Sequence, residues 1–337
     1  MNQIQQQQIA AYLKKHLETE GKITFTAFKG GASNLTYSIK DNDNEWIMRT
    51  SPPGTKAKGA HDMHREYQLL KQLHDDFPLC PEVVLMCRDD NVYEREFYLM
   101  QPINGIIIRR ELPKIYHGTD LSLLCKELVK VHHQLHQVPT NNLQKFNKGV
   151  GYIDRQISGW VHRYTRVAPT EDMAEPVIKW LVNNQPEDNR SYTLIHNDYK
   201  FDNVVFDKSN NDQIIGVLDW EMTTVGDPLM DLGCSLAYWF EGTDHELLKQ
   251  ISMMPTYLDG MLSRDEIVHH YCLASGQSID NYHYYYIYGL FRLAVILQQI
   301  YYRYENGQSD NPAFKPLGMV RDLILKQAID HLKPPTI

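Results

Sequence analysis

The sequence predicts an α+β protein of two lobes, an antiparallel β-sheet lobe followed by a mainly helical lobe. The chain has 337 residues, which is long for one hydrophobic core and favours two. Its first hundred residues contain short segments in which apolar and polar side chains alternate, as they do in half-buried strands. Beyond Pro102 the apolar residues recur at helical spacing, so the lobe boundary is expected near Met100–Gly105.

The first lobe is predicted to be a sheet with one helix inserted after its third strand. Residues 2–18 form a short amphipathic helix with a polar start, and three strands follow after Gly21: TFTAFKG, LTYSIKD and EWIMRT. Proline and glycine in residues 51–59 predict a loop. The segment HDMHREYQLLKQLHDDF then has apolar residues at helical spacing. Two more strands, VVLMCRDD and EREFYLMQPI, complete this sheet.

The second lobe is predicted to contain helices interrupted by one pair of strands. The strand pair covers residues 192–219, where the polar run Ser209–Asp212 indicates a turn between the strands. The helices are expected at residues 120–138, 171–184, 245–250, 281–305 and 318–332.

Composition argues against several classes of protein. The formal net charge is −8 and no basic stripe is present, which argues against a nucleic-acid partner. No apolar run approaches the ~20 residues that a membrane helix needs, and the start of the chain lacks the pattern of a secretory signal. Five scattered cysteines form no CxxC pair, so neither zinc nor disulfides are indicated. We therefore expect a cytoplasmic monomer or homodimer with a small-molecule partner and no membrane partner.

A pair of histidines allows two interpretations. In VHHQLHQ, His132 and His136 lie four residues apart on one helix face, a spacing that can hold a metal ion. No HExxH pattern surrounds them, and no further ligand is evident in the sequence. Packed or solvated histidines near a helix end are the favoured interpretation.

The segment from Tyr192 to Glu221 carries the most chemical information. In an antiparallel hairpin, opposed residues have a constant index sum, so a turn centred at position 211 places Asn203 opposite Asp219. Asp198 precedes the same end of the hairpin. Carboxylate and amide oxygens suit Mg²⁺, and phosphoryl transfer needs metal ligands together with a group that orients the attacking hydroxyl. We predict that Asp198 orients or deprotonates an acceptor hydroxyl, and that Asn203 and Asp219 bind Mg²⁺.

The motifs HNDYKFDN, GVLDWE and GDPLMDLG together resemble the aminoglycoside phosphotransferase and choline kinase group, which has the protein-kinase-like fold. The resemblance covers roughly residues 22–305. It implies that Asp198 is the catalytic aspartate and that Asn203 and Asp219 hold magnesium. It also implies that His196 and Asp231 support the catalytic loop.

A kinase-like fold requires a nucleotide site in the first lobe. Arg49, in the third strand, stands where most kinases have lysine; arginine keeps the positive charge and can bind phosphate through two donors. Glu66 on the following helix is its expected ion-pair partner, with a solvated helix glutamate as the alternative. The segment from Tyr98 to Met100 is expected to contact adenine. The first lobe also contains the small residues Gly30, Gly31, Ser33 and Asn34. They either let backbone N–H groups approach phosphate or form a plain hairpin turn.

The acceptor is predicted to bind the second lobe near Trp160, Arg163 and Arg292. The segment 281–304 contains eight tyrosines, two arginines and no acidic residue, whereas a polycationic aminoglycoside would need carboxylates. An anionic or neutral acceptor therefore fits better, although such arginines and tyrosines also serve as structural residues. QISGWVHRY, LSRDEIVHHY and FRLAVILQQIYYR resemble the kinase-like domains associated with acyl-CoA dehydrogenases, which implies a hydroxyacyl-CoA.

The sequence thus predicts a small-molecule kinase that uses ATP or GTP with Mg²⁺. Residues 1–101 are expected to be the nucleotide-binding lobe, and residues 102–337 the catalytic and acceptor-binding lobe. Arg49 favours one alternative, a nucleotide-binding pseudokinase or regulatory module. An aminoglycoside-modifying kinase is a second alternative. A protein kinase fits less well, because no APE-like segment follows Asp219.

Overall fold

The computed structural model describes residues 1–28, 34–52, 62–170, 172–188, 191–276, 278 and 282–332. The chain divides into two compact units. The first unit comprises Met1–Gly105 and Ile215–Met222, and the second comprises Ile106–Ile214 and Thr223–Ile337. The functional division at residues 101 and 102 stays a prediction. None of the described helices is both long and apolar enough to cross a membrane.

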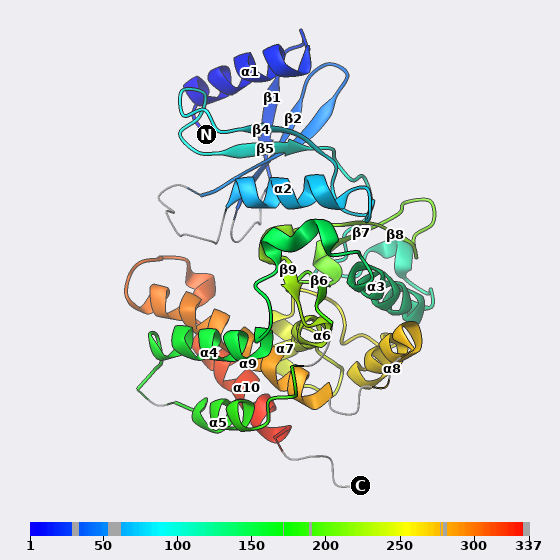
Figure 1. The fold of residues 1–337 in the computed structure, drawn as a ribbon, viewed down its shortest axis with the longest axis vertical. Helices are drawn as coiled ribbons and strands as arrows, with labels where there is room; N and C mark the ends of the chain where they lie inside the picture. Colours follow the sequence, from blue (N-terminus) through cyan, green and yellow to red (C-terminus); the bar gives the residue numbers. More distant parts are fainter. Residues whose placement is uncertain are drawn as a thin grey trace. The chain divides into compact units, whose positions relative to one another are not determined.

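The first unit contains a five-stranded antiparallel sheet with strand order β1-β2-β3-β5-β4. Its strands β1, β2, β4 and β5 are labelled in Figure 1. The predicted sheet with one helix after its third strand is confirmed. The predicted N-terminal helix is confirmed as well. The elements are α1 (Gln3–Leu17), β1 (Thr24–Ala27), β2 (Leu35–Lys40), β3 (Glu45–Thr50), α2 (Met63–Leu73), β4 (Val83–Cys87), β5 (Phe97–Met100) and η4 (Trp220–Met222).

Side chains that alternate along the strands and point to one face of the sheet form the hydrophobic core of this unit. Ile39 and Met48 are fully buried on one face of the sheet and pack with Phe97 of β5. Ile9 and Leu13 of α1 join the same cluster. The β3–β5 register pairs Arg49 with Tyr98, so these two side chains occupy neighbouring positions on the sheet.

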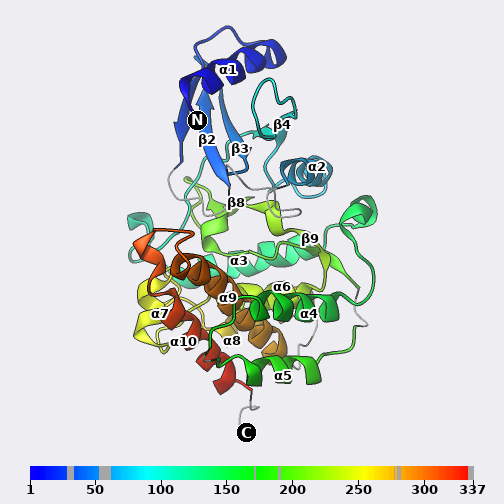
Figure 2. The same ribbon diagram turned by 90° about the vertical axis from the view of Figure 1, so that its left-hand side faces the viewer.

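The second unit is mainly helical, as predicted (Figure 2). Its α-helices are α3 (Leu121–His136), α4 (Tyr152–Thr165), α5 (Glu175–Asn183), α6 (Pro228–Ala237), α7 (Glu246–Ile251), α8 (Arg264–Ser275), α9 (Tyr282–Glu305) and α10 (Leu317–Asp330). Its 3₁₀ segments are η1 (Lys114–Tyr116), η2 (Asn141–Phe146), η3 (Phe201–Asn203) and η5 (Pro312–Phe314). The helices α4, α6 and α8 lie outside the segments predicted as helical.

Short strands frame the polar loops of the second unit. β6 (Thr193–Ile195) pairs antiparallel with β9 (Thr224–Gly226), a strand that was not predicted. β7 (Val204–Phe206) and β8 (Ile214–Val217) form a two-stranded sheet; β8 begins in the second unit at Ile214, and its residues from Ile215 onward are counted with the first unit. The predicted turn lies between them, where the Asp207 N–H donates to the Gln213 carbonyl at 2.9 Å.

Helices α6 and α9 make a close crossing that positions two site residues. A Cβ atom on Gly233 would lie 2.0 Å from the Tyr285 carbonyl oxygen, and one on Gly289 would lie 2.0 Å from the Gly233 carbonyl oxygen. Only glycine allows this approach of the two backbones. Asp231 lies two residues before Gly233, and Arg292 lies one helical turn after Gly289.

Candidate active site

Arg49 lies at the centre of a charged cluster in the first unit. Its Nη2 atom is 2.6 Å from Asp219 Oδ1 and 3.6 Å from Glu221 Oε2. Its Nη1 atom is 3.5 Å from Glu66 Oε1, which confirms the expected ion pair. Glu66 is only 1% exposed, so it is not a solvated helix glutamate. The predicted role of Arg49 in phosphate binding stays a prediction.

Three carboxylates around one guanidinium leave an excess of negative charge. Burial raises the pKa of Glu66, while Arg49 opposes this change. Burial lowers the pKa of Arg49, but Glu66 and the other neighbours outweigh burial and hold it well above its usual value. Asp219 adopts φ +67°, a left-handed conformation that is uncommon outside glycine and is often found at functional sites. This cluster of hard oxygen atoms suits a divalent cation.

The other predicted nucleotide-binding residues lie around this cluster or outside the described residues. Tyr98 is fully buried, and burial followed by the charge of Glu66 raises its pKa well above the usual value. Its side chain therefore belongs to the Arg49 cluster, while Met100 ends strand β5 and is 8% exposed. The Asn34 Nδ2 atom donates to Glu221 Oε2 at 2.5 Å. Gly30, Gly31 and Ser33 lie outside the described residues.

Glu221 was missed by the sequence analysis, although it follows Asp219 by two positions in the DWE motif. It contacts both Asn34 and Arg49. Glu221 is identified by its contact with Asn34, a residue of the predicted phosphate-binding turn, and only the structure shows this contact.

Asp198 lies in a hydrogen-bonded loop of the second unit. Its Oδ2 atom accepts from Lys200 Nζ at 2.5 Å and from Asn203 Nδ2 at 2.8 Å. The Asn203 Nδ2 atom also donates to the Asp198 carbonyl at 2.8 Å. The Asp198 side chain is 21% exposed, which leaves the carboxylate accessible to a substrate hydroxyl. Because both bonds of Asn203 use its nitrogen, its amide oxygen is the atom oriented to serve a cation.

Lys200 is a second residue that the sequence analysis missed. It lies two positions after Asp198, and its Nζ atom is 3.4 Å from Asp202 Oδ1 as well as 2.5 Å from Asp198. Burial lowers the pKa of Lys200, but the two carboxylates outweigh burial and raise it. A lysine that stays charged beside the predicted catalytic aspartate can neutralise charge on a transferred phosphoryl group.

Asp231 fixes the backbone of the same loop. Its Oδ2 atom accepts from the His196 N–H at 2.8 Å, and its Oδ1 atom accepts from the Asn197 N–H at 2.6 Å. His196 is fully buried, and its Nδ1 atom accepts from the Asp198 N–H at 3.3 Å. The structure therefore brings His196 and Asp231 to the loop that presents Asp198.

The two histidines of α3 are buried against the same aspartate. The Nε2 atoms of His132 and His136 each lie 3.1 Å from Asp231 Oδ2, and His136 Nδ1 lies 2.6 Å from the Tyr271 hydroxyl. The three groups could hold a metal ion, since their ligand atoms lie within 4.8 Å of one another. The same atoms also contact one another directly, since both Nε2 atoms reach Asp231 Oδ2. Burial, reinforced by His132, lowers the pKa of His136 to about 4, so this ring is neutral near pH 7.

The three predicted acceptor residues lie together in the second unit. The Arg163 guanidinium lies 4.6 Å from the Trp160 ring centroid, and the Arg292 guanidinium lies 5.3 Å from it. Arg163 is exposed, whereas Arg292 is 4% exposed. Burial lowers the pKa of Arg292, but Cys234 and other neighbours, including Asp198, outweigh burial.

The predicted pairing of Asn203 with Asp219 joins residues of different units. This pairing stays a prediction. Within its own unit each residue lies in a polar cluster: Asn203 with Asp198 and Lys200, and Asp219 with Arg49.

Comparisons with known proteins place this geometry among phosphotransferases. The model of the phosphotransferase enzyme family matches residues 24–265. Acyl-CoA dehydrogenase family member 11 of Homo sapiens is 30% identical over 90% of this chain and 40% of its own length. A probable acyl-CoA dehydrogenase of Arabidopsis thaliana is 31% identical over 84% of this chain and 36% of its own length. The chain thus spans less than half the length of the curated relatives it matches.

Solved structures share the fold. A putative aminoglycoside phosphotransferase from Ralstonia eutropha has a TM-score of 0.79 and 24% identity, with 97% of each chain covered. A spectinomycin phosphotransferase in complex with ADP and spectinomycin has a TM-score of 0.62 and 14% identity, covering 98% of this chain and 99% of the other. Choline kinase LicA from Streptococcus pneumoniae has a TM-score of 0.60 and 14% identity, covering 96% and 98%. These likenesses confirm the predicted two-lobed, protein-kinase-like fold.

Proposed function

The chain belongs to the phosphotransferase enzyme family and is a small-molecule phosphotransferase, and we propose that it transfers the γ-phosphoryl group of magnesium ATP or GTP to a hydroxyl of an anionic or neutral metabolite. The observation that carries this proposal is the Asp198 carboxylate, which is partly exposed and is held by both Lys200 and Asn203. A carboxylate held in this way can orient an acceptor hydroxyl and accept its proton.

The proposed roles follow from the atoms that each side chain offers. Asp198 orients the hydroxyl, and Lys200 offsets charge that develops on the transferred group. The Asn203 amide oxygen and the Asp219 carboxylate would hold magnesium, which when bound neutralises phosphate oxygens. Arg49 provides the cation for the remaining phosphates of the nucleotide, and Glu66 keeps its guanidinium in place.

A hydroxyacyl-CoA is the proposed class of acceptor. Relatives of this chain are named as acyl-CoA dehydrogenases, and the chain spans about 40% of their length. Arg163 and Arg292 at the predicted acceptor side suit an anionic or strongly polarised group, and they disfavour a polycationic aminoglycoside. A bound ADP in the related spectinomycin phosphotransferase supports the use of a nucleotide.

The test is a coupled assay of ADP or GDP release with a panel of hydroxylated metabolites and hydroxyacyl-CoAs. Asp198→Asn is expected to lower acceptor-dependent turnover by at least about 100-fold, because the general base is lost. Asp207→Asn is the control: Asp207 lies in the exposed β7–β8 turn, where it caps the Ser209 N–H. Wild-type turnover by Asp198→Asn would show that Asp198 has been assigned wrongly.

A nucleotide-binding regulatory module is the second candidate, and one contact favours it. Arg49 Nη2 lies 2.6 Å from Asp219 Oδ1. A predicted phosphate-binding group and a predicted magnesium ligand are therefore paired with each other. Calorimetry with MgATP and MgGTP separates the candidates. Nucleotide binding without product release for any acceptor or water would favour the regulatory module, whereas acceptor-dependent release excludes it.

A further inference from the structure

Arg292 is a buried cation without a carboxylate partner. Its residue is 4% exposed, and its guanidinium lies 5.3 Å from the Trp160 ring centroid and beside the Cys234 thiol. Among the residues that the structure describes, no carboxylate lies within ion-pair distance of Arg292. Burying an unpaired charge is costly, so a fold that keeps one there needs a reason other than stability.

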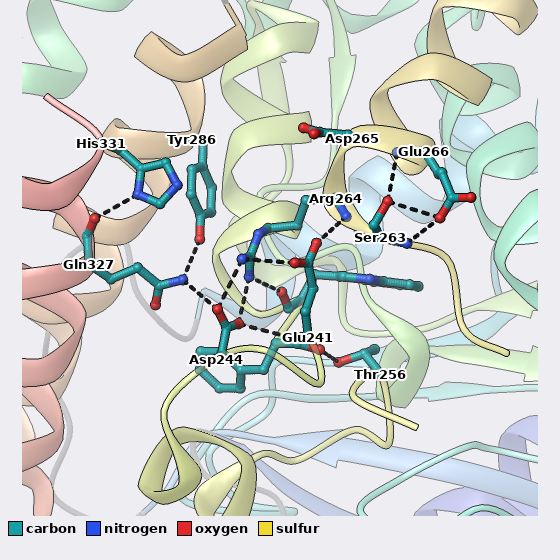
Figure 3. A network of polar contacts seen from close by, with 12 residues as sticks. Glu241, Asp244, Thr256, Ser263, Arg264, Asp265, Glu266, Tyr286, Gln327 and His331 are labelled. Atoms are coloured by element: carbon teal, nitrogen blue, oxygen red, sulfur yellow. Dashed lines mark hydrogen bonds and ion pairs between the residues drawn. The ribbon is translucent and has the colours of Figure 1, made fainter. Parts of the chain in front are cut away.

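A partly buried arginine of the same unit, Arg264, shows how a structural guanidinium is neutralised. Arg264 at the start of α8 forms ion pairs with Glu241 at 3.2 Å and Asp244 at 2.6 Å, and it also donates to the Trp239 carbonyl at 2.9 Å (Figure 3). Gln327 of α10 donates to Asp244 in the same network. Arg264 is more exposed than Arg292, with 12% of its side chain accessible, and yet its charge is matched by two carboxylates whereas that of Arg292 is not.

Further polar groups beside Arg292 are buried without full hydrogen bonding. Within the described part of the chain, neither the Tyr152 hydroxyl nor the Trp160 Nε1 atom has a hydrogen-bond partner of normal geometry; their polar neighbours are Asn197 and Tyr288. The Tyr288 hydroxyl reaches Gln156 Oε1 at 3.5 Å, a long contact. Buried donors of this kind are usually fully bonded, so these two incompletely satisfied groups beside Arg292 can still donate to an oxygen atom of a ligand.

The chemistry of these residues narrows the class of that ligand. The surroundings are aromatic rings and a thiol, which suit a short carbon chain, while a guanidinium and an indole N–H donate hydrogen bonds to oxygen. A guanidinium fork matches a carboxylate, and it also binds a carbonyl oxygen. Asp231 of α6 holds the loop that presents Asp198, and α6 meets α9 at Gly289, one helical turn before Arg292. Arg292 and Asp198 therefore lie on adjoining elements, and the bound oxygen and the reacting hydroxyl would belong to one small group.

We infer that Arg292, Trp160 and Tyr152 form a subsite that binds the acyl oxygen of the acceptor beside Asp198. This inference rests on the proposed function and names the specificity-determining group of that site. The acyl oxygen is either the carboxylate of a hydroxy acid or the thioester carbonyl of a hydroxyacyl-CoA. The transferred phosphoryl group remains with Lys200 and the magnesium ligands.

Stability gives the first test, and it needs no knowledge of the acceptor. Arg292→Met removes an unpaired buried charge and keeps the volume, so we expect the melting temperature to rise by about 2 °C or more. Arg264→Met is the matched control, and it is expected to lower the melting temperature because Glu241 and Asp244 lose their partner. Equal destabilisation by the two substitutions would overturn the inference, since Arg292 would then be structural.

Acceptor discrimination gives the second test. Turnover is measured with 3-hydroxybutyrate, 3-hydroxybutyryl-CoA and 1,3-butanediol, which lacks the acyl oxygen. The wild type is expected to prefer one of the two acyl compounds over the diol. A preference for 3-hydroxybutyrate identifies a carboxylate as the source of the oxygen, and a preference for 3-hydroxybutyryl-CoA identifies a thioester carbonyl. In Arg292→Met this preference should fall by at least about 100-fold, and Arg292→Lys should keep part of it, because lysine retains the charge without the fork. An unchanged preference, or an equal loss with all three acceptors, would contradict an acyl-oxygen subsite.

Ligand-induced thermal shifts separate failure of this inference from failure of the proposed function. The shift produced by 3-hydroxybutyrate and by its CoA thioester is compared in the wild type and in Arg292→Met, without nucleotide. A shift confined to the wild type supports the subsite even if no phosphoryl transfer is found, in which case the proposed function is wrong. The same shift in both proteins, or a shift in neither, overturns the subsite whether or not turnover occurs.

Discussion

Acidification from pH 7 to pH 5 is expected to destabilise the protein through His136. This ring is fully buried between His132, Asp231 and Tyr271, and its pKa is lowered from 6.5 to about 4 by burial and then by His132. Asp231 opposes that change, and Asp227 also faces the ring with its charge. The folded state therefore keeps His136 neutral in a range where the unfolded chain protonates it.

The size of the effect follows from the two pKa values. Because the folded pKa lies below the unfolded pKa, the stabilisation is complete above pH 6.5 and is lost as the pH falls toward 4. Integrating proton binding between pH 7 and pH 5 gives a loss of about 2 kcal/mol in the free energy of unfolding. The complete shift corresponds to about 3 kcal/mol.

Urea unfolding at pH 7 and pH 5 measures this loss in the wild type and in His136→Gln. Glutamine does not titrate, and its Nε2 atom can still donate to Asp231. The wild type should lose about 2 kcal/mol more than the variant between the two pH values, and the difference cancels other titrating groups. His162→Gln is the control, because His162 is exposed. Equal pH dependence in wild type and His136→Gln would refute the neutral, buried state of His136.

Three further substitutions test the packing and charges around the site. Gly289→Ala should lower the free energy of unfolding by at least about 3 kcal/mol, measured by urea unfolding, because its Cβ would lie 2.0 Å from a backbone oxygen; Gly159→Ala, which meets only the flexible Arg163 side chain, should be neutral or stabilising. Glu66→Ala should cost about 3 kcal/mol in the same assay, since it breaks a buried ion pair. Lys200→Met should lower kcat by about 100-fold. The melting temperature is measured alongside, because the substitution leaves Asp198 and Asp202 without their cation; unchanged kcat would remove the proposed role of Lys200.

The sequence alone predicts the helices and strands whose apolar residues recur at a clear spacing. The strands from Thr24 to Met100 alternate, and the helix from Tyr282 to Glu305 is long and apolar, so local pattern decides them. β9 has only three residues, Thr224–Gly226, and exists because β6 pairs with it. α6 begins at Pro228 behind the N-cap Asp227, whose side chain accepts from two backbone N–H groups. That helix is short and largely buried, so amphipathic spacing does not reveal it.

The candidate site was predictable where residues are close in the sequence. Asp198, Lys200 and Asn203 lie within six positions, so one loop brings them together. The pairing of Arg49 with Glu66 was predictable only because a kinase-like fold is expected to have an ion pair between a strand and the next helix. Glu221 needed the tertiary structure, because 172 positions separate it from Arg49 (221 − 49 = 172). No local pattern carries such a contact.

The Arg49–Asp219 contact bears on two functions that the sequence left open, an active kinase and a nucleotide-binding pseudokinase. With three carboxylates around it, Arg49 is more tightly held than a cation that only awaits phosphate. Phosphate oxygens would compete with Asp219 for Arg49, and a divalent cation would compete with Arg49 for Asp219. A magnesium nucleotide offers both groups a new partner at once, whereas free nucleotide separates the pair and leaves Asp219 beside an anion. Arginine in place of lysine therefore predicts a strong dependence of nucleotide binding on magnesium, and the substitution by itself does not make the protein a pseudokinase.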